Sequence, residues 1–172
     1  MIQQGEWTAP DEMAAEVEVA EFICGLIRLM KPNLVIETGC YHGHTSHAIR
    51  VALRKNKKGV LHTCDSDLHN ARMGDAQFRP GEDMIFLLPD NSVDIAFLDS
   101  GGEFARAREA KELIPKLSPI AFVLLHDSLN KEDKCHTEIS AVCNWPSVVL
   151  PYGRGLTMFC IGQDIAQARI PR

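Results

Sequence analysis

Four short apolar runs, each followed by an acidic residue, constrain the fold more than any other feature of this sequence. They read LVIE, VLHTCD, VDIAFLD and IAFVLLHD, and they end at Glu37, Asp65, Asp99 and Asp127. Short runs rich in branched residues are typical of strands buried on both faces of a parallel sheet. We expect the four acids near the edge where such sheets bind ligands, beyond the carboxyl ends of the strands.

Segments with helical periodicity separate these runs. Apolar residues recur at three- and four-residue intervals in residues 11–30, 45–55 and 104–117, and Asp11 is placed to cap the first helix. Alternation of strand and helix from residue 34 to residue 125 predicts a parallel sheet with right-handed crossovers.

The C-terminal part of the chain predicts a hairpin. Its two apolar runs, residues 147–152 and 156–162, are separated only by Gly153, Arg154 and Gly155. Such a short glycine-containing connection favours an antiparallel pair. The hairpin would add a reversed strand to the parallel sheet.

Residues 66–88 are harder to interpret. They are consistent with a short helix, a short strand near Phe78 and a turn at Pro80 and Gly81, and residues 84–88 fit either a strand or a helical turn. A further helix is predicted near residues 137–143. We expect one α/β domain over residues 1–172, with an N-terminal helix in residues 1–31 and a Rossmann-like core in residues 32–172.

Composition excludes several classes of function. Of the 172 residues, 45% are apolar and 24% are charged, which is typical of a globular protein, and the net charge of −5 offers no basic face for nucleic acid. No apolar run reaches about twenty residues, so no membrane span is expected, and the N-terminus lacks the pattern of a signal peptide. Six cysteines without a CxxC pair indicate a reducing, cytoplasmic compartment.

A glycine-rich segment, IETGCYHGHTS, connects the first predicted strand to the next helix. Gly39 permits a tight turn or the close approach of a ligand, Gly43 lets the helix begin near the sheet, and Thr45 and Ser46 can bind free amides of its first turn. The segment lacks the dinucleotide pattern G-x-G-x-x-G and the P-loop lysine. Phosphate is therefore a poor ligand for this turn.

Two of the acids suggest what the turn binds instead. Glu37 suits a cationic group, and Asp65, with Asp67 two residues later, is placed to accept hydrogen bonds from both hydroxyls of a ribose. A ligand with a ribose, a cation and no phosphate fits S-adenosylmethionine. A zinc site formed by Cys40 and the histidines of the same segment does not match the spacing of structural zinc sites.

The sequence resembles the class I S-adenosylmethionine-dependent methyltransferases, in the catechol O-methyltransferase-like and small-molecule and sugar O-methyltransferase group. The stretches VIETGCYHGHTS, LHTCDSD, VDIAFLDSG and FVLLHDS carry this resemblance in the family's order. It implies a Rossmann-like, seven-stranded, mostly parallel sheet with helices on both faces and a C-terminal antiparallel hairpin. The cofactor-binding residues that it implies are Glu37, Thr38, Gly39, Cys40, Gly43, Thr45, Ser46, Asp65, Ser66 and Asp99, with Glu82 or Asp83 at the adenine amine.

The resemblance also implies catalytic residues. Metal-dependent members hold magnesium between acids after the fourth and fifth strands, which correspond to Asp99 and Asp127, with Ser128 in place of their asparagine. Their lysine base corresponds to Gly102, which disfavours a catechol substrate. His126 is then a candidate base or ligand, since neutral histidine is available near pH 7. Strand-end acids without a metal are the alternative.

The expected function is methyl transfer from S-adenosylmethionine to the hydroxyl of a small acceptor, with or without Mg²⁺. The alternative is an inactive cofactor-binding or interaction module with the same fold. A nucleotide-dependent oxidoreductase is disfavoured because the dinucleotide pattern is missing. No nucleic acid or membrane partner is expected. The short segments available to cover the acceptor leave open a homo-oligomer in which a partner subunit closes the pocket.

Overall fold

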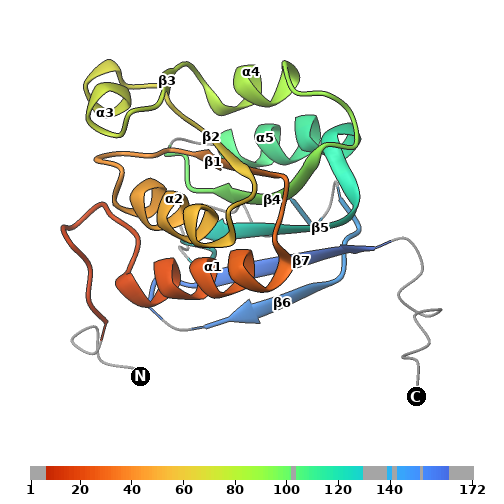
Figure 1. Cartoon of the computed structure of the whole chain (residues 1–172), viewed down its shortest axis with the longest axis horizontal. Helices are drawn as coiled ribbons and strands as arrows, with labels where there is room; N and C mark the ends of the chain where they lie inside the picture. The colour runs from red at the N-terminus through yellow and green to blue at the C-terminus, as the bar shows by residue number, and fades with distance from the viewer. Residues whose placement is uncertain (1–6, 102–103, 130–138, 141–142, 152, 163–172) are drawn as a thin grey trace.

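Seven strands form one sheet in the described part of the chain, which comprises residues 7–101, 104–129, 139–140, 143–151 and 153–162 of a computed structural model (Figure 1). The sheet order is β3-β2-β1-β4-β5-β7-β6. The strands are β1 (Leu34–Thr38), β2 (Val60–Asp65), β3 (Gln77–Phe78), β4 (Val93–Leu98), β5 (Leu117–His126), β6 (Ser147–Leu150) and β7 (Leu156–Gly162).

Strands β1 to β5 pair in parallel, whereas β7 runs antiparallel to both β5 and β6. The strand order reverses between β1 and β4, because the chain first builds outward through β2 and β3. The carboxyl ends of β1, β2, β4 and β5 therefore lie along one edge of the sheet. This is the position at which open parallel sheets bind ligands.

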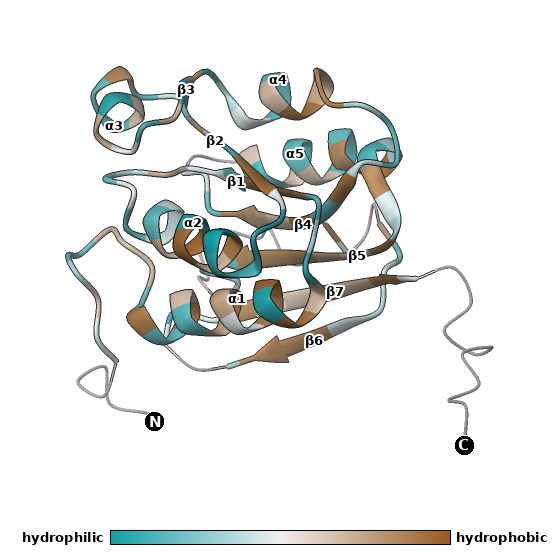
Figure 2. Cartoon of the chain, in the orientation of Figure 1, coloured by the Kyte–Doolittle hydropathy of each residue, from teal (hydrophilic) through white to brown (hydrophobic). Residues whose placement is uncertain are grey.

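Helices cover both faces of the sheet. They are α1 (Val17–Met30), α2 (His44–Asn56), α3 (Leu68–Met73), α4 (Gly81–Phe86), α5 (Ala105–Leu113) and the 3₁₀ helix η1 (Ile114–Lys116). Figure 1 shows α1 and α2 in front of the sheet. In Figure 2 the strands are mostly hydrophobic, whereas the helices mix hydrophilic and hydrophobic segments.

The core has two layers because successive residues of a strand point to opposite faces. On one face Val35 packs with Ile23 and Ile27 of α1 and with Ile49 of α2. On the other face Ile36 belongs to the cluster of buried residues contributed by α4 and α5. These two layers fix the height of the helices relative to the ligand-binding edge.

The predicted α/β sheet and its closing hairpin are confirmed. Residues 66–88 fold as α3, β3 and α4, so residues 84–86 close a helix and residues 87–88 leave it in a turn, which is the helical one of the two alternatives. The helix predicted near residues 137–143 falls largely outside the described residues. None of the helices in the described ranges has both the length and the apolar character that a membrane span requires.

The N-terminal helix begins later than predicted. It starts at Val17, and residues 7–16 form an irregular segment, here called the strap. Asp11 does bind two backbone amides, but these belong to a turn within the strap. Glu16, the N-cap of α1, has the extended backbone usual at that position, and its side chain reaches inward to His126 and Arg154. Helix α5 also ends early, at Leu113, since Pro115 cannot continue an α-helix.

Candidate active site

A cavity of about 280 Å³ lies at the carboxyl edge of the sheet, near the lower end of the range for ligand pockets, roughly 300–1,000 Å³. It lies where the strand order reverses. Four of the expected site residues line it: Gly39, Asp65, Ser66 and Asp99. Its other lining residues are Met13, Tyr41, Asp67, Asn70, Ser100 and Gly101.

Two glycines of the turn after β1 shape this cavity. Gly39 has a φ of 73°, and a Cβ atom there would overlap the carbonyl oxygen of Asp99 at the end of β4. Gly43 has a φ of 81°, and its Cβ would lie 2.7 Å from the Cα of Gly74. Both positions therefore require glycine, which brings the turn against β4 on one side and against the end of α3 on the other.

Asp65 is held by local backbone amides. Its Oδ2 accepts a hydrogen bond of 2.9 Å from the amide of Tyr41, and its Oδ1 accepts one of 2.8 Å from the amide of Asp67. Each carboxylate oxygen can accept a second bond. The side chain is 8% exposed and borders the cavity. Asp65 therefore keeps acceptor capacity at the wall of the cavity.

Glu37 lies behind the turn and is not among the residues that line the cavity. It is 1% exposed and accepts hydrogen bonds from the hydroxyls of Ser46 and Thr63, the latter at 2.6 Å. Burial raises the pKa of Glu37 to about 7. The residue joins β1 to β2 and to the first turn of α2, so the structure gives it a structural role beside the expected cofactor contact.

The hydroxyl of Ser46 therefore binds a side chain, not a free amide of the first turn as expected. Gly43 is the N-cap of α2 and offers no capping side chain. Thr45 is buried in the same turn. Neither Thr45 nor Ser46 lines the cavity.

Thr38 and Cys40 are also not among the residues that line the cavity. Thr38 donates a hydrogen bond of 2.8 Å to Glu109 of α5, which covers the face of the sheet opposite to α1 and α2. The thiol of Cys40 lies 3.8 Å from the carbonyl oxygen of Asn70, and burial raises its pKa to about 12. Cys40 is consequently a neutral thiol that packs the turn against α3.

The residues proposed for the adenine amine lie on α4. Glu82 forms an ion pair of 3.0 Å with Arg108 of α5. Asp83 lines a different surface hollow, together with Phe78 and Arg79. Neither acid borders the cavity that contains Asp65.

Several lining residues were not predicted. Tyr41, Ser100 and Gly101 belong to the same glycine-rich and strand-end stretches as the predicted residues, so their position next to the motifs could have identified them. Asn70 follows Asp67, which caps α3 through a 3.0 Å hydrogen bond from the amide of Asn70. Met13 comes from the strap. No sequence pattern connects Met13 with the sheet.

His126 occupies a buried position between two carboxylates. Its Nδ1 lies 2.9 Å from Oδ1 of Asp99, and its Nε2 lies 2.7 Å from Oε2 of Glu16. Burial opposes protonation of His126, but the charge of Asp99 and the two hydrogen bonds outweigh it and raise its pKa to about 10. The ring is thus an imidazolium at neutral pH. Contrary to expectation, His126 is a poor base.

Glu16 of the strap and Arg154 of the hairpin complete this charged cluster. Oε1 of Glu16 lies 3.2 Å from Nε of Arg154, which lies 3.3 Å from Oδ1 of Asp127. Burial opposes ionisation of Glu16, but the hydrogen bond from His126 outweighs it and lowers the pKa of Glu16 to about 2. We call these five residues, Asp99, His126, Glu16, Arg154 and Asp127, the ion-pair cluster.

This cluster does not fit the magnesium ion that the resemblance implied. Asp99, His126 and Asp127 present ligand atoms within 4.8 Å of one another. However, the charge of Asp99 is compensated by the His126 imidazolium, and Asp127 is close to both His126 and Arg154. A divalent cation would have to displace these positive groups. The hydroxyl of Ser128 is buried without a hydrogen-bond partner, but one neutral oxygen does not offset this repulsion.

A family model and several solved structures match this chain. A family model described as "Methyltransferase domain" matches residues 36–128, more than half of the chain. A search of curated protein sequences gives no match.

Solved methyltransferases share the fold. The SAH-bound methyltransferase PaMTH1 of Podospora anserina aligns with a TM-score of 0.75 at 16% identity, over 91% of this chain and 83% of that one. The O-methyltransferase TomG of Streptomyces achromogenes, in complex with SAM, aligns with a TM-score of 0.72 at 14% identity, over 95% and 100%. A methyltransferase of Geobacter sulfurreducens aligns with a TM-score of 0.70 at 15% identity, over 87% and 80%.

The match of the family model spans three of the four acid-ended runs completely and reaches Ser128, the residue after the fourth acid. It therefore includes the turn at Gly39, the acid Asp65 and three of the five residues of the ion-pair cluster, Asp99, His126 and Asp127. With the sheet order and the cavity at its carboxyl edge, this match confirms the resemblance: the chain belongs to the methyltransferase domain family and has the fold of the class I enzymes.

Proposed function

We propose that this protein transfers a methyl group from S-adenosylmethionine to the hydroxyl of a small acceptor without the help of a metal ion. The observation that carries the proposal is the cavity in which Gly39, Asp65 and Asp99 meet at the reversal of strand order. The SAH and SAM complexes of the structural neighbours, one of them an O-methyltransferase, support it.

In this proposal the cofactor supplies an already activated methyl group. Asp65 accepts hydrogen bonds from the ribose hydroxyls, while its own backbone partners at Tyr41 and Asp67 hold it in place. Gly39 lets the backbone approach the methionine portion closely. Asp99, which lies 2.9 Å from Nδ1 of His126, offers its carboxylate to cationic groups in the cavity.

The protein must also orient the acceptor and receive its proton. With His126 protonated, Asp127 is the better candidate base in the ion-pair cluster. Burial raises the pKa of Asp127 above its usual value, which makes it a stronger base than an exposed carboxylate. We propose that Asp99 orients the acceptor hydroxyl and that Asp127 receives the proton.

Calorimetry with S-adenosylhomocysteine tests cofactor binding directly. Asp65→Ala should weaken binding by about 1–3 kcal/mol, because the ribose hydroxyls lose a buried acceptor. Asp90→Ala, at an exposed acid that pairs with Lys116, is the matched control and should bind as the wild type does. Folded wild-type protein that does not bind at millimolar ligand would refute the proposal.

The second candidate is a cofactor-binding module without catalysis. The ion-pair cluster favours it, because Asp99 and Asp127 are both partnered by cationic side chains. A methyl-transfer assay over a panel of small hydroxylated acceptors separates the two functions. Transfer that is lost in Asp65→Ala supports the enzyme, whereas cofactor binding without any transfer supports the module.

A further inference from the structure

Three side chains converge near the cavity, outside the groups used above. Nδ1 of His42 lies 3.7 Å from Oδ2 of Asp11, and Nε2 of His44 lies 3.8 Å from the same oxygen. The three ligand atoms all lie within 4.8 Å of one another. His42 comes from the turn after β1 and His44 is the first residue of α2, whereas Asp11 comes from the strap. All three side chains are accessible, with exposed fractions of 32–50%.

The surrounding backbone orients these groups. Oδ1 of Asp11 accepts hydrogen bonds from the amides of Met13, at 2.9 Å, and Ala14, at 2.8 Å, which turns Oδ2 toward the histidines. The ring of His42 stacks on Tyr41 with a centroid separation of 3.8 Å. The carboxylate and one imidazole are therefore held in place by interactions within their own segments.

We propose that Asp11, His42 and His44 bind a transition-metal ion of the zinc type, with water in the fourth position. Two imidazoles and one carboxylate are a donor set that suits such ions and not magnesium. Metal–ligand bonds of about 2.0–2.2 Å in tetrahedral geometry place neighbouring ligand atoms roughly 3.4 Å apart. The distances of 3.7 and 3.8 Å would need to shorten by only a few tenths of an ångström.

The ion would fasten the strap to the wall of the cavity. Met13 and Tyr41 both line the cavity, and each is a near neighbour in sequence of a proposed ligand. The amide of Tyr41 also holds Asp65. A metal at this site would therefore order groups that face the cofactor, and by linkage each ligand should tighten the binding of the other. This coupling rests on the proposed function, whereas binding of the ion does not.

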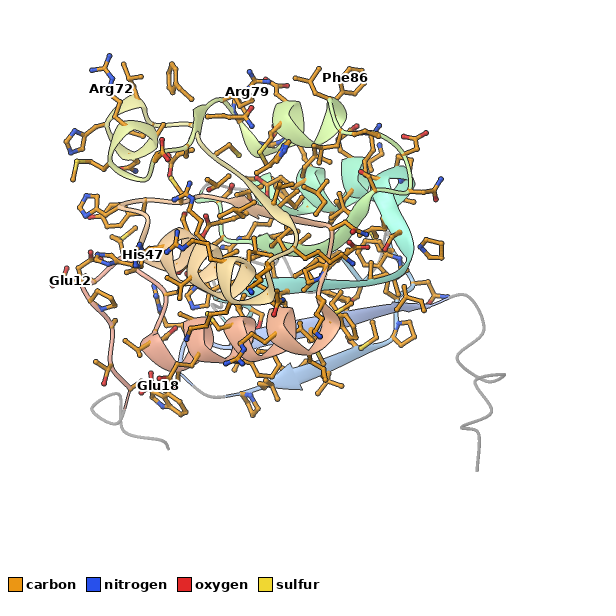
Figure 3. The ribbon with its side chains drawn as sticks, in the orientation of Figure 1. Glu12, Glu18, His47, Arg72, Arg79 and Phe86 are labelled. Carbon is orange, nitrogen blue, oxygen red and sulfur yellow. The ribbon has the colours of Figure 1, made fainter. Side chains whose placement is uncertain are left out.

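The chain offers a competing arrangement. His44 and His47 are three residues apart on α2, and residues at this spacing share one face of a helix. Figure 3 shows His47 and the strap residue Glu12 on the same side of the molecule. A site formed by His44 and His47 would not need Asp11. The thiol of Cys40 is turned toward Asn70 and is not part of either arrangement.

Titration calorimetry of the full chain with ZnCl₂, without cofactor, tests the site. We expect one ion per chain, and a loss of affinity of about tenfold or more in Asp11→Asn, His42→Asn and His44→Asn, since even outer partners of metal ligands contribute that much. His62→Asn, on β2 outside the cluster, is the control and should bind as the wild type does. Thermal unfolding of each variant checks that it is folded.

Two results would overturn the site. One is the absence of zinc binding by folded wild-type protein. The other is binding that survives Asp11→Asn but is lost in His47→Asn, which would assign the ion to the helix pair. Because His42 lies outside the helix pair, His42→Asn separates the two arrangements even if the strap tolerates no change at Asp11.

The coupling is tested by titrating S-adenosylhomocysteine with and without saturating zinc. We expect affinity at least about fivefold higher with the metal, the lower end of typical coupling between sites, and no such gain in His44→Asn. Equal affinities would overturn the coupling. Zinc binding by a protein that never binds S-adenosylhomocysteine would refute the proposed function and leave the metal site standing.

Discussion

The two halves of the ligand-binding edge are built in different ways. At the ends of β1 and β2, Asp65 is held by amides of Tyr41 and Asp67, which are 24 and 2 residues away in sequence. At the ends of β4 and β5, His126 is held by Glu16, which is 110 residues away, and Glu16 meets Arg154 across 138 residues. The first half is a local motif, whereas the second exists only after three distant segments have folded together.

The halves also differ in charge. Asp65 has backbone amides as its partners, which leaves acceptor capacity directed at the cavity. In the ion-pair cluster each carboxylate faces a cationic side chain. The first half therefore keeps acceptor capacity at the cavity, whereas the second half also holds the strap and the hairpin against the sheet.

The largest effect is expected for Glu16→Gln. Removal of one partner from a buried ion pair leaves charge uncompensated and costs about 3–5 kcal/mol of the free energy of unfolding. Urea denaturation followed by circular dichroism measures it. Glu21→Gln, at an exposed position of α1, is the control and should change stability by no more than about 0.5 kcal/mol. A loss below about 1 kcal/mol in Glu16→Gln would contradict a structural role for the cluster.

Gly39→Ala should have the second-largest effect on the free energy of unfolding. The left-handed backbone costs about 1–2 kcal/mol for a residue with a Cβ atom, and the overlap with the backbone of Asp99 costs about 1–3 kcal/mol more. Binding of S-adenosylhomocysteine should weaken as well, because the turn must move. Gly25→Ala in α1, where a Cβ atom would meet nothing within 4 Å, should leave stability unchanged or raise it. Equal effects at the two glycines would reject the packing argument.

The pH dependence of stability should differ between the halves. The pKa of Glu37 is raised from 4.5 to about 7, so the folded protein binds this proton more tightly than the unfolded chain does. The contribution of Glu37 to the free energy of unfolding is therefore lost as pH rises from about 4.5 to 7. The pKa of His126 is raised from 6.5 to about 10, so its contribution is lost between about pH 6.5 and 10.

Urea denaturation at a series of pH values separates these two windows. Glu37→Gln should flatten the dependence of the free energy of unfolding on pH below pH 7. Buried Glu109, whose pKa is also raised to about 7, contributes to the same pH range. Glu16→Gln should flatten the profile above pH 6.5. If both variants altered the same window, the two halves would not be electrostatically separate.

The smallest effect is expected when Mg²⁺ is added to the methyl-transfer reaction or removed from it. Because the cationic groups of the ion-pair cluster occupy the place of the expected ion, methyl transfer should be unchanged by added Mg²⁺ or by excess chelator. Initial rates with and without chelator measure this. Activity that requires Mg²⁺ would show that His126 and Arg154 move aside, and it would restore the metal to the second half of the edge.

Patterns contained within short segments were sufficient to predict most of the fold. The acid-ended runs, the glycine turn and the hairpin glycines predicted the parallel sheet, the edge that carries the cavity and the reversed strand. They also placed Gly39, Asp65 and Asp99 at the ligand-binding edge, and the family resemblance added Ser66; all four line the cavity. These predictions succeed because β1, β2 and β4 place their ends side by side by a regular rule of parallel sheets.

The sequence by itself therefore determined the alternation of strands and helices, the glycine turn and the place of Asp65 at a strand end, since each depends on backbone geometry and on residues nearby in the chain. Only the tertiary structure decided the start of α1, the inward position of Glu16, the charge of His126 and the approach of Asp11 to His42 and His44. The physical reason is that a pKa and an ion pair depend on which charges are close in space. Here those charges lie up to 138 residues apart in the chain, and no local periodicity records their distance.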